Sequence, residues 1–201
     1  MDSATTTRKK EITRDDIMDM AEYAKVRKEQ RRRMIEKKKL RRVAIGPDAT
    51  AHFEDYDSMW LQVHEMLFIE KGGEAQLADE LEAYNPLIPQ GRELVCTVLF
   101  EIEDEARRRR FLAALGGVEE TMFIRVDGEE IKGEAETDVD RTTAEGKASS
   151  VHFIHFPFTD GQVEKFRRPD AEVVVGFKHP AYGHMALLSD GTRRALAEDF
   201  D

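Results

Sequence analysis

The segment RELVCTVLFEI at residues 92–102 constrains the fold more than any other part of this sequence. Apolar residues occupy both of its alternating faces, which is the pattern of a strand that is covered on both sides. It therefore predicts a central strand of a sheet. Cys96 shares one of these faces with Leu94, Val98 and Phe100, so we expect it to pack in the core. A nucleophilic cysteine needs exposure and an electropositive neighbour, which this pattern does not indicate.

A helix that is apolar on most sides is predicted before this strand. The segment MWLQVHEMLFIEKGG follows Asp57 and Ser58, either of which suits an N-terminal cap, and it ends at Gly72-Gly73. Its apolar surface is interrupted only by a narrow polar strip, formed by Ser58, Gln62, Glu65 and Glu70. Such a helix is buried, and we expect it to be the central helix of the protein.

The rest of the sequence interleaves strand and helix signals. Strands are predicted at residues 41–47, 49–55, 122–126, 129–133, 151–158, 172–177 and 185–189, and helices at residues 74–84, 103–115, 162–166 and 190–198. Asp127-Gly128 is the strongest hairpin signal, and residues 134–149 read as a polar, acidic loop. This arrangement predicts an α+β fold with a mainly antiparallel or mixed sheet packed with helices.

The N-terminal region differs in composition from the rest of the chain. Residues 1–12 are polar and are predicted to be a disordered tail. Thr13 and Asp16 resemble a capping box, which predicts a basic N-terminal helix over residues 13–40. Residues 41–201 are then expected to form a single α+β domain.

This N-terminal helix changes character along its length. Its first half carries an apolar stripe, formed by Ile17, Met20, Ala21 and Ala24. Beyond Ala24 the same face is charged, and residues 25–42 contain 11 Lys or Arg and 2 Glu. We therefore expect the first half to pack on the domain and the second half to be mostly solvated.

The basic segment belongs to an acidic chain. The formal net charge is −10, of which residues 8–42 carry +8 and residues 43–201 carry −17. The favoured interpretation is a helix that is solvated or docked on the acidic domain; a docking surface for an acidic protein and a nucleic-acid contact are the alternatives. No interleaved aromatic residue and no nucleic-acid-binding motif supports the last. The residues assigned to partner docking are Arg31, Arg32, Arg33, Lys37, Lys38 and Lys39.

The cysteine content and the absence of long apolar runs exclude several classes of protein. A single cysteine cannot form an intrachain disulfide or hold an iron–sulfur cluster alone. No apolar run approaches the length of a membrane span. The N-terminal sequence MDSATTTRKK lacks the apolar segment of a secretory signal, so a cytoplasmic location is expected.

Six histidines supply the remaining candidates for chemistry. His52 and Glu54 share one face of a predicted strand, whereas His152 and His155 face opposite sides of another. His64 lies on an apolar helix face, which favours a buried structural role. No pair has the i, i+4 spacing of a helical metal motif, so we expect no bound metal and no cofactor. The candidate ligand or metal pool is His52, Glu54, His64, His152, His155, His179 and Tyr182.

Several stretches, in this order, resemble a known family. RRVAIGP, the EML of HEMLFIE, YNPLIP, SSVHFIHFP and HPAY are similar to an uncharacterised bacterial family, domain of unknown function 3501. The resemblance runs from about Ile12 to the C-terminus, and it associates a glutamine with the position of His64. It implies no activity and no catalytic residue. It does imply a genomic context beside rubrerythrin-like proteins and iron–sulfur oxidoreductases, in bacteria that handle redox stress.

The sequence thus leaves the activity unknown and favours a non-enzymatic protein. The leading hypothesis is a cytoplasmic accessory protein whose basic helix docks on a redox metalloprotein of the kind that the resemblance implies. The alternative is a small metal- or ligand-binding enzyme that uses the histidine and glutamate pool. A third hypothesis is a nucleic-acid-binding regulator that acts through the basic helix.

Overall fold

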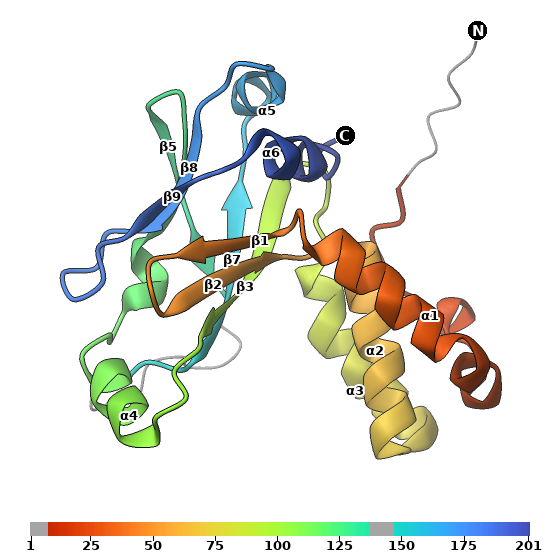
Figure 1. Cartoon of the computed structure of the whole chain (residues 1–201). Coiled ribbons are helices and arrows are strands. Elements are labelled where there is room, and N and C mark those ends of the chain that lie inside the picture. Colours follow the sequence, from red (N-terminus) through yellow and green to blue (C-terminus); the bar gives the residue numbers. More distant parts are fainter. Residues whose placement is uncertain (1–7, 137–146) are drawn as a thin grey trace, which may run out of the picture.

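The computed structural model describes residues 8–136 and 147–201. Within these residues the chain forms two antiparallel sheets and six α-helices, which confirms the predicted α+β fold. Figure 1 shows helices α1, α2 and α3 grouped on one side of the molecule, with α4, α5 and α6 arranged around the sheets.

The first sheet has five strands in the order β1-β2-β3-β7-β6. These strands are β1 (Arg42–Ile45), β2 (Ala49–Phe53), β3 (Glu93–Phe100), β6 (Glu134–Ala135) and β7 (Val151–Pro157). β3 pairs with β2 on one side and with β7 on the other, so the prediction of a central strand is confirmed.

The second sheet has four strands in the order β5-β4-β8-β9. These strands are β4 (Met122–Val126), β5 (Glu129–Lys132), β8 (Val173–Phe177) and β9 (Met185–Leu187). The β4–β5 hairpin turns at Asp127 and Gly128, whose φ angles are 46° and 84°. A two-residue hairpin turn of type I′ needs positive φ at both positions, which is why this dipeptide predicted the hairpin correctly.

Both faces of β3 are covered, as its composition requires. Leu94, Cys96 and Val98 belong to the core between the two sheets, whereas Val95 belongs to a second core beneath the helices. Cys96 is fully buried, as predicted. One strand therefore contributes alternate side chains to two cores.

Three helices pack near the first sheet and form the helical layer: α1 (Met20–Lys38), α2 (Tyr56–Glu70) and α3 (Gly73–Tyr84). α2 contacts both α1 and α3, in agreement with its prediction as the central helix, but it is not buried all round: Ile69 is largely exposed, whereas Ser58 of the predicted polar strip is buried. It begins earlier than predicted, because Asp55, rather than Asp57 or Ser58, caps it by accepting a hydrogen bond from the Ser58 N–H.

The remaining helices are short. They are α4 (Glu105–Ala113), α5 (Asp160–Arg167) and α6 (Asp190–Ala197), with 3-10 turns at Arg14–Asp16, Asn85–Leu87 and Val118–Thr121. Ser189 caps α6, as its sequence predicts. Of the loop predicted at residues 134–149, the first two residues pair as β6, and residues 137–146 lie outside the described part of the chain.

The start of the N-terminal helix was predicted too early. Thr13 and Asp16 form the expected capping box, but it opens only the 3-10 turn. α1 begins at Met20, where the side chain of Asp19 accepts from two backbone N–H groups. The extended residues between the turn and α1 explain the difference, because a capping box specifies a helical turn but not its continuation.

Residues 8–12, which we expected to belong to a disordered tail, lie against the rest of the structure. Ile12 is buried in the core beneath the helices and exchanges two hydrogen bonds with the side chain of Asn85. Residues 1–7 lie outside the described part of the chain. The division into a helix at 13–40 and a separate domain at 41–201 stays a prediction.

The predicted apolar stripe anchors the N-terminal region only in part: Ile17 and Met20 are half-buried and pack against the core beneath the helices, but the two alanines do not. Ala21 and Ala24 are exposed, whereas Tyr23 and Met34 are buried against α2. The ring of Tyr23 contacts the rings of α2, and burying this large side chain turns the neighbouring face of the helix outward.

Candidate functional site

The inner side of α1 is joined to α2 by ion pairs. Arg27 forms a bidentate pair with Glu65 at N–O distances of 2.8 and 2.7 Å. Lys37 lies 2.7 Å from a carboxylate oxygen of both Asp55 and Asp57. These contacts agree with the interpretation of the basic segment as a helix docked on the acidic part of the chain.

Three of the six residues assigned to partner docking face the body of the protein. Arg33 and Lys37 both contact Asp57, Arg33 at 3.5 Å, and Arg31 lies 3.9 Å from Glu65. Part of their charge is therefore compensated within the fold.

The other three residues assigned to docking point elsewhere. Arg32 and Lys39 pair with glutamates of the same helix, Glu29 and Glu36, and stay exposed. Lys38 lines a cleft to which neither Arg32 nor Lys39 contributes. The six residues therefore do not form one continuous surface, because nine consecutive helical positions point all around the axis.

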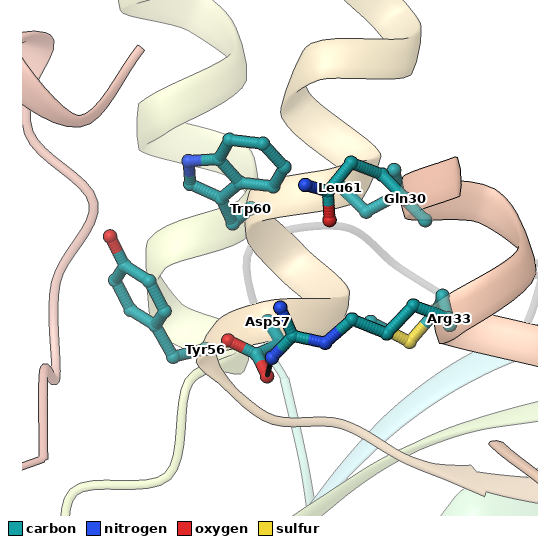
Figure 2. A pocket seen from close by; sticks show the side chains of 7 residues that line it. Gln30, Arg33, Tyr56, Asp57, Trp60 and Leu61 are labelled. Atoms are coloured by element: carbon teal, nitrogen blue, oxygen red, sulfur yellow. Dashed lines mark hydrogen bonds and ion pairs between the residues drawn. The ribbon is translucent and has the colours of Figure 1, made fainter. Parts of the chain in front are cut away.

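Figure 2 shows a pocket of about 210 Å³ between α1 and the start of α2. Arg33 extends from α1 toward Asp57, and the rings of Tyr56 and Trp60 project from α2. The indole N–H of Trp60 donates to the backbone carbonyl of Asp16. Arg33, Asp57 and the indole N–H of Trp60, which line this pocket, thus have partners within the protein. The pocket is therefore a weak candidate for a ligand site.

An open groove, here named the α1 groove, runs beside α1 where the helix meets the end of α2 and the start of α3. It consists of an apolar part of about 640 Å³ and a basic part of about 830 Å³, which share Ala24 and Phe68. The apolar part is also lined by Ile17, Met20, Ala21, Leu67 and Leu77, together with the charged residues Arg14, Asp19, Lys71 and Glu74. The basic part is lined by Lys25, Arg27, Lys28, Arg31, Arg32 and Ile35, with Glu29 as its single carboxylate. The stripe that we expected to pack on the domain lines this open surface, with Ile17 and Met20 half-buried and Ala21 and Ala24 exposed.

His64 has its polar atoms engaged within the helical layer. Its Nδ1–H donates to the Trp60 carbonyl at 2.7 Å, and its Nε2 accepts from the Met18 N–H at 3.1 Å. Burial lowers the pKa of His64, so the ring is neutral and packs between Trp60 and Tyr23. With both nitrogens in use, it has no lone pair to offer a metal.

His179 and Tyr182 stabilise the turn between β8 and β9. The Tyr182 hydroxyl donates to the Ile45 carbonyl at 2.6 Å and accepts from two backbone N–H groups near the start of β2. The ring of His179 donates to one backbone carbonyl and accepts from one backbone N–H. Both residues therefore act within the fold.

His152 and His155 face opposite sides of β7, as predicted. His152 is buried, with Nδ1 3.8 Å from a carboxylate oxygen of Glu119. His155 lies between Glu93 and Glu136, at 3.1 and 3.3 Å. Burial alone would lower the pKa of His155, but its hydrogen bonds to Glu136 and Glu93 outweigh burial and raise the pKa to about 9. Both nitrogens of this imidazolium donate, so neither can bind a metal.

His52 and Glu54 line one cleft of about 330 Å³ between the first sheet and the helical layer. Arg42 Nε donates to His52 Nδ1 at 3.2 Å. Burial and the nearby charges of Arg42 and Lys38 lower the pKa of His52 to about 4. Of the seven residues in the ligand pool, these are the two that the structure brings into one cavity.

The ligand pool as a whole does not converge on one site. Among residues 8–136 and 147–201, no three or more His, Cys, Asp or Glu residues are grouped so that they could hold a metal ion. In the same ranges, no helix combines the length and apolar character that crossing a membrane needs.

Sequence reasoning missed two groups of functional interest. Glu93 and Glu136 come beside His155 only because β3 and β6 flank β7, a register that spacing along the chain does not reveal. Lys38 and Arg42 appeared only as members of the basic segment. The hairpin pattern of residues 41–55 was a usable signal, because pairing β1 with β2 across their short turn places Arg42 opposite His52.

The fold and these surfaces define an α+β protein with two antiparallel sheets, a helical layer and an open apolar and basic groove. The family described as "Protein of unknown function (DUF3501)" matches residues 11–200, and the chain belongs to this family, as its resemblance indicated. Among solved structures it is similar to a novel protein of unknown function from Burkholderia pseudomallei K96243. The TM-score is 0.87 and the identity 38%, and the match covers 94% of this chain and 99% of that chain. No curated protein matches.

Proposed function

We propose that the protein is a non-enzymatic accessory protein that docks on an acidic partner protein through the α1 groove. The observation that carries the proposal is the continuity of an apolar part and a basic part within one open groove. Such a groove complements a partner segment that presents apolar side chains flanked by carboxylates, as an amphipathic acidic helix does.

The exposed side chains of the basic part support this proposal. The side chain of Arg32 is 74% exposed and pairs only with Glu29 among the described residues. Lys28 is exposed and has no ion pair in the same part of the chain. Ile35 is 62% exposed and lines the groove with them. An apolar side chain among cations suits a contact that supplies both apolar surface and negative charge.

The class of partner comes from the family context rather than from the groove. The resemblance implies a rubrerythrin-like protein or an iron–sulfur oxidoreductase, and thus a redox metalloprotein in the cytoplasm. The groove adds that the docking segment of that partner carries acidic and apolar residues.

The two other hypotheses have less support. Apart from His52 and Glu54, which line one cleft, the residues proposed for an enzyme lie in separate places, and most of their polar atoms are bound within the fold. A nucleic-acid contact needs a continuous basic surface. The basic residues of α1 point around the whole helix, and Arg33 and Lys37 are compensated by Asp57.

The test uses a double charge reversal, Lys28→Glu with Arg32→Glu, because neither side chain pairs with the body of the protein. Binding to a purified rubrerythrin-like protein and to an iron–sulfur oxidoreductase from the same genome is measured by interferometry at about 50 and about 300 mM salt. We expect wild-type binding to weaken with salt, and the double variant to bind about tenfold or more weakly, chiefly through a slower on-rate.

The matched control reverses two exposed cations away from the groove, Arg110→Glu with Arg194→Glu. This control changes the net charge equally and should bind like wild type. If both double variants lost the same amount of binding affinity, the effect would be a non-specific consequence of net charge. Absence of binding to either metalloprotein would remove this partner class from the proposal.

A further inference from the structure

The cleft lined by His52 and Glu54 is a second candidate site, and it shares no lining residue with the α1 groove. Its volume of about 330 Å³ suits a small molecule rather than a protein segment. It lies between the end of α1, the start of β1 and the outer face of the first sheet.

One side of the cleft gathers hydrogen-bond donors, here named the donor corner: Lys38, Arg42 and His52. Among the described residues, no ion pair joins Lys38 or Arg42 to a carboxylate, and Arg42 Nε donates to His52. Because His52 Nδ1 accepts from Arg42, the proton of the neutral ring is on Nε2. That buried Nε2 has no hydrogen-bond acceptor within the described residues. The corner therefore offers two cations without an anionic partner, beside the neutral ring of His52, whose Nε2 is enclosed by the protein.

The single carboxylate of the cleft does not compensate this corner. One oxygen of Glu54 accepts from the Ser58 hydroxyl at 2.7 Å, and the other accepts from the Thr97 hydroxyl at 2.8 Å. These bonds direct both oxygens toward neutral hydroxyls. Glu54 therefore supplies no hydrogen-bond acceptor to the donor corner.

The cleft also has an apolar lining, here named the apolar wall. It is formed by Met59, Leu87, Leu99, Val151 and Phe153. Leu99, Val151 and Phe153 are only partly buried, although they lie on strands in the middle of the sheet. Partly exposed apolar side chains at such a position gain free energy when a ligand covers them.

We propose that the cleft binds a small organic carboxylate, with its anionic group at the donor corner and its apolar body against the apolar wall. The carboxylate supplies the acceptor that the corner lacks, and the apolar body covers the exposed part of the wall. Inorganic phosphate satisfies only the first requirement, and a neutral apolar molecule satisfies only the second. A metal ion satisfies neither, because the corner consists of donors.

The probes are benzoate and hexanoate, titrated into the full chain and followed by calorimetry and by amide chemical shifts. We expect saturable binding at one site with shifts confined to the cleft, and about tenfold or more weaker binding of benzamide and of inorganic phosphate. Arg42→Gln and Lys38→Gln should each weaken benzoate binding severalfold. Arg33→Gln, a matched change on the same helix outside the cleft, should leave it unchanged.

A second readout separates binding from a folding effect. The pKa of His52, about 4 in the free protein, should rise when benzoate is bound, because the carboxylate offsets the charges of Arg42 and Lys38. Ring titration by NMR in wild type measures this without any substitution. Failure of both carboxylates to saturate, or binding that Arg42→Gln and Lys38→Gln leave unchanged, overturns the proposal. Neither result bears on the α1 groove.

Discussion

Arg27 of α1 and Glu65 of α2 form a bidentate ion pair, and the Tyr23 hydroxyl donates to the same carboxylate at 2.7 Å. Three donors thus converge on one partly buried acceptor. This carboxylate and the buried ring of Tyr23 hold the first half of α1 on α2, and the pairs of Lys37 with Asp55 and Asp57 hold its end.

Glu65→Gln is expected to loosen α1 without unfolding the sheets. The substitution keeps the size of the side chain but removes the charge that Arg27 and Tyr23 share, so the free energy of unfolding should fall by about 1–2 kcal/mol. Urea denaturation measures the loss, and hydrogen exchange should place it in α1. Glu29→Gln, which breaks an exposed pair with Arg32, should have a much smaller effect on stability, because solvent screens this pair. Equal effects of the two substitutions would contradict this assignment.

Local patterns account for how much of the fold could be predicted. The alternation in β3, the Asp127-Gly128 turn and the apolar surface of α2 each specify their element through nearby residues. The inner face of α1 was predicted wrongly at Ala21 and Ala24, because Ala24 and Tyr23 are adjacent and both apolar enough to be buried. Only packing against the rings of α2 decides that Tyr23 faces inward.

The candidate sites were less predictable for a different reason. His52 and Glu54 could be placed on one face from their spacing, because both are on the same strand. The cleft around them also needs α1, α3 and β7, which come from distant parts of the sequence. The same holds for His155, whose pKa depends on carboxylates 62 residues before and 19 residues before it.

The stability of the protein should fall as the pH rises from about 6.5 to about 9, because the folded-state pKa of His155 is raised to about 9 from an ordinary value of 6.5. The protonated ring favours the folded state, so its contribution is complete below pH 6.5 and is lost through pH 9. After allowance for screening at this partly exposed site, the loss should be about 1–2 kcal/mol.

Urea denaturation at several pH values measures this slope, and His155→Gln supplies the control. The variant cannot be protonated, so its stability should be flatter over the same range. A wild-type protein with no slope, or a variant with an equal slope, would show that other groups govern the alkaline loss.

Cys96 should be inert in the folded protein. Its side chain is fully buried between the two sheets, and burial raises the pKa of the thiol far above its ordinary value. A thiol reagent should therefore label it only after denaturant is added. Cys96→Asp should destabilise the fold by several kcal/mol, because it places an unpaired charge in the core. Cys96→Ala, which leaves only a small cavity, should cost about 1–2 kcal/mol. Fast labelling without denaturant would contradict the burial of this residue.

His64→Gln should be tolerated better than His64→Leu. A glutamine side chain retains an acceptor for the Met18 N–H and a donor for the Trp60 carbonyl, the two bonds that His64 makes. Leucine leaves both backbone groups without this partner, so it should destabilise the protein by about 1–3 kcal/mol. Thermal and urea denaturation of the two variants provide the comparison. If leucine were the better replacement, packing rather than hydrogen bonding would be the role of this residue.

Duplex DNA should bind the protein only weakly, with a Kd above about 10⁻⁴ M at physiological salt. Arg27, Arg33 and Lys37 are engaged by carboxylates of the body, so the helix presents less free charge than its sequence contains. The −17 carried by residues 43–201 repels a polyanion that approaches the exposed remainder. Fluorescence anisotropy across a salt series measures this affinity. Micromolar binding that is lost in the Lys28→Glu, Arg32→Glu double variant would instead make the basic helix a nucleic-acid contact. That result would contradict the proposal that the α1 groove binds a protein partner.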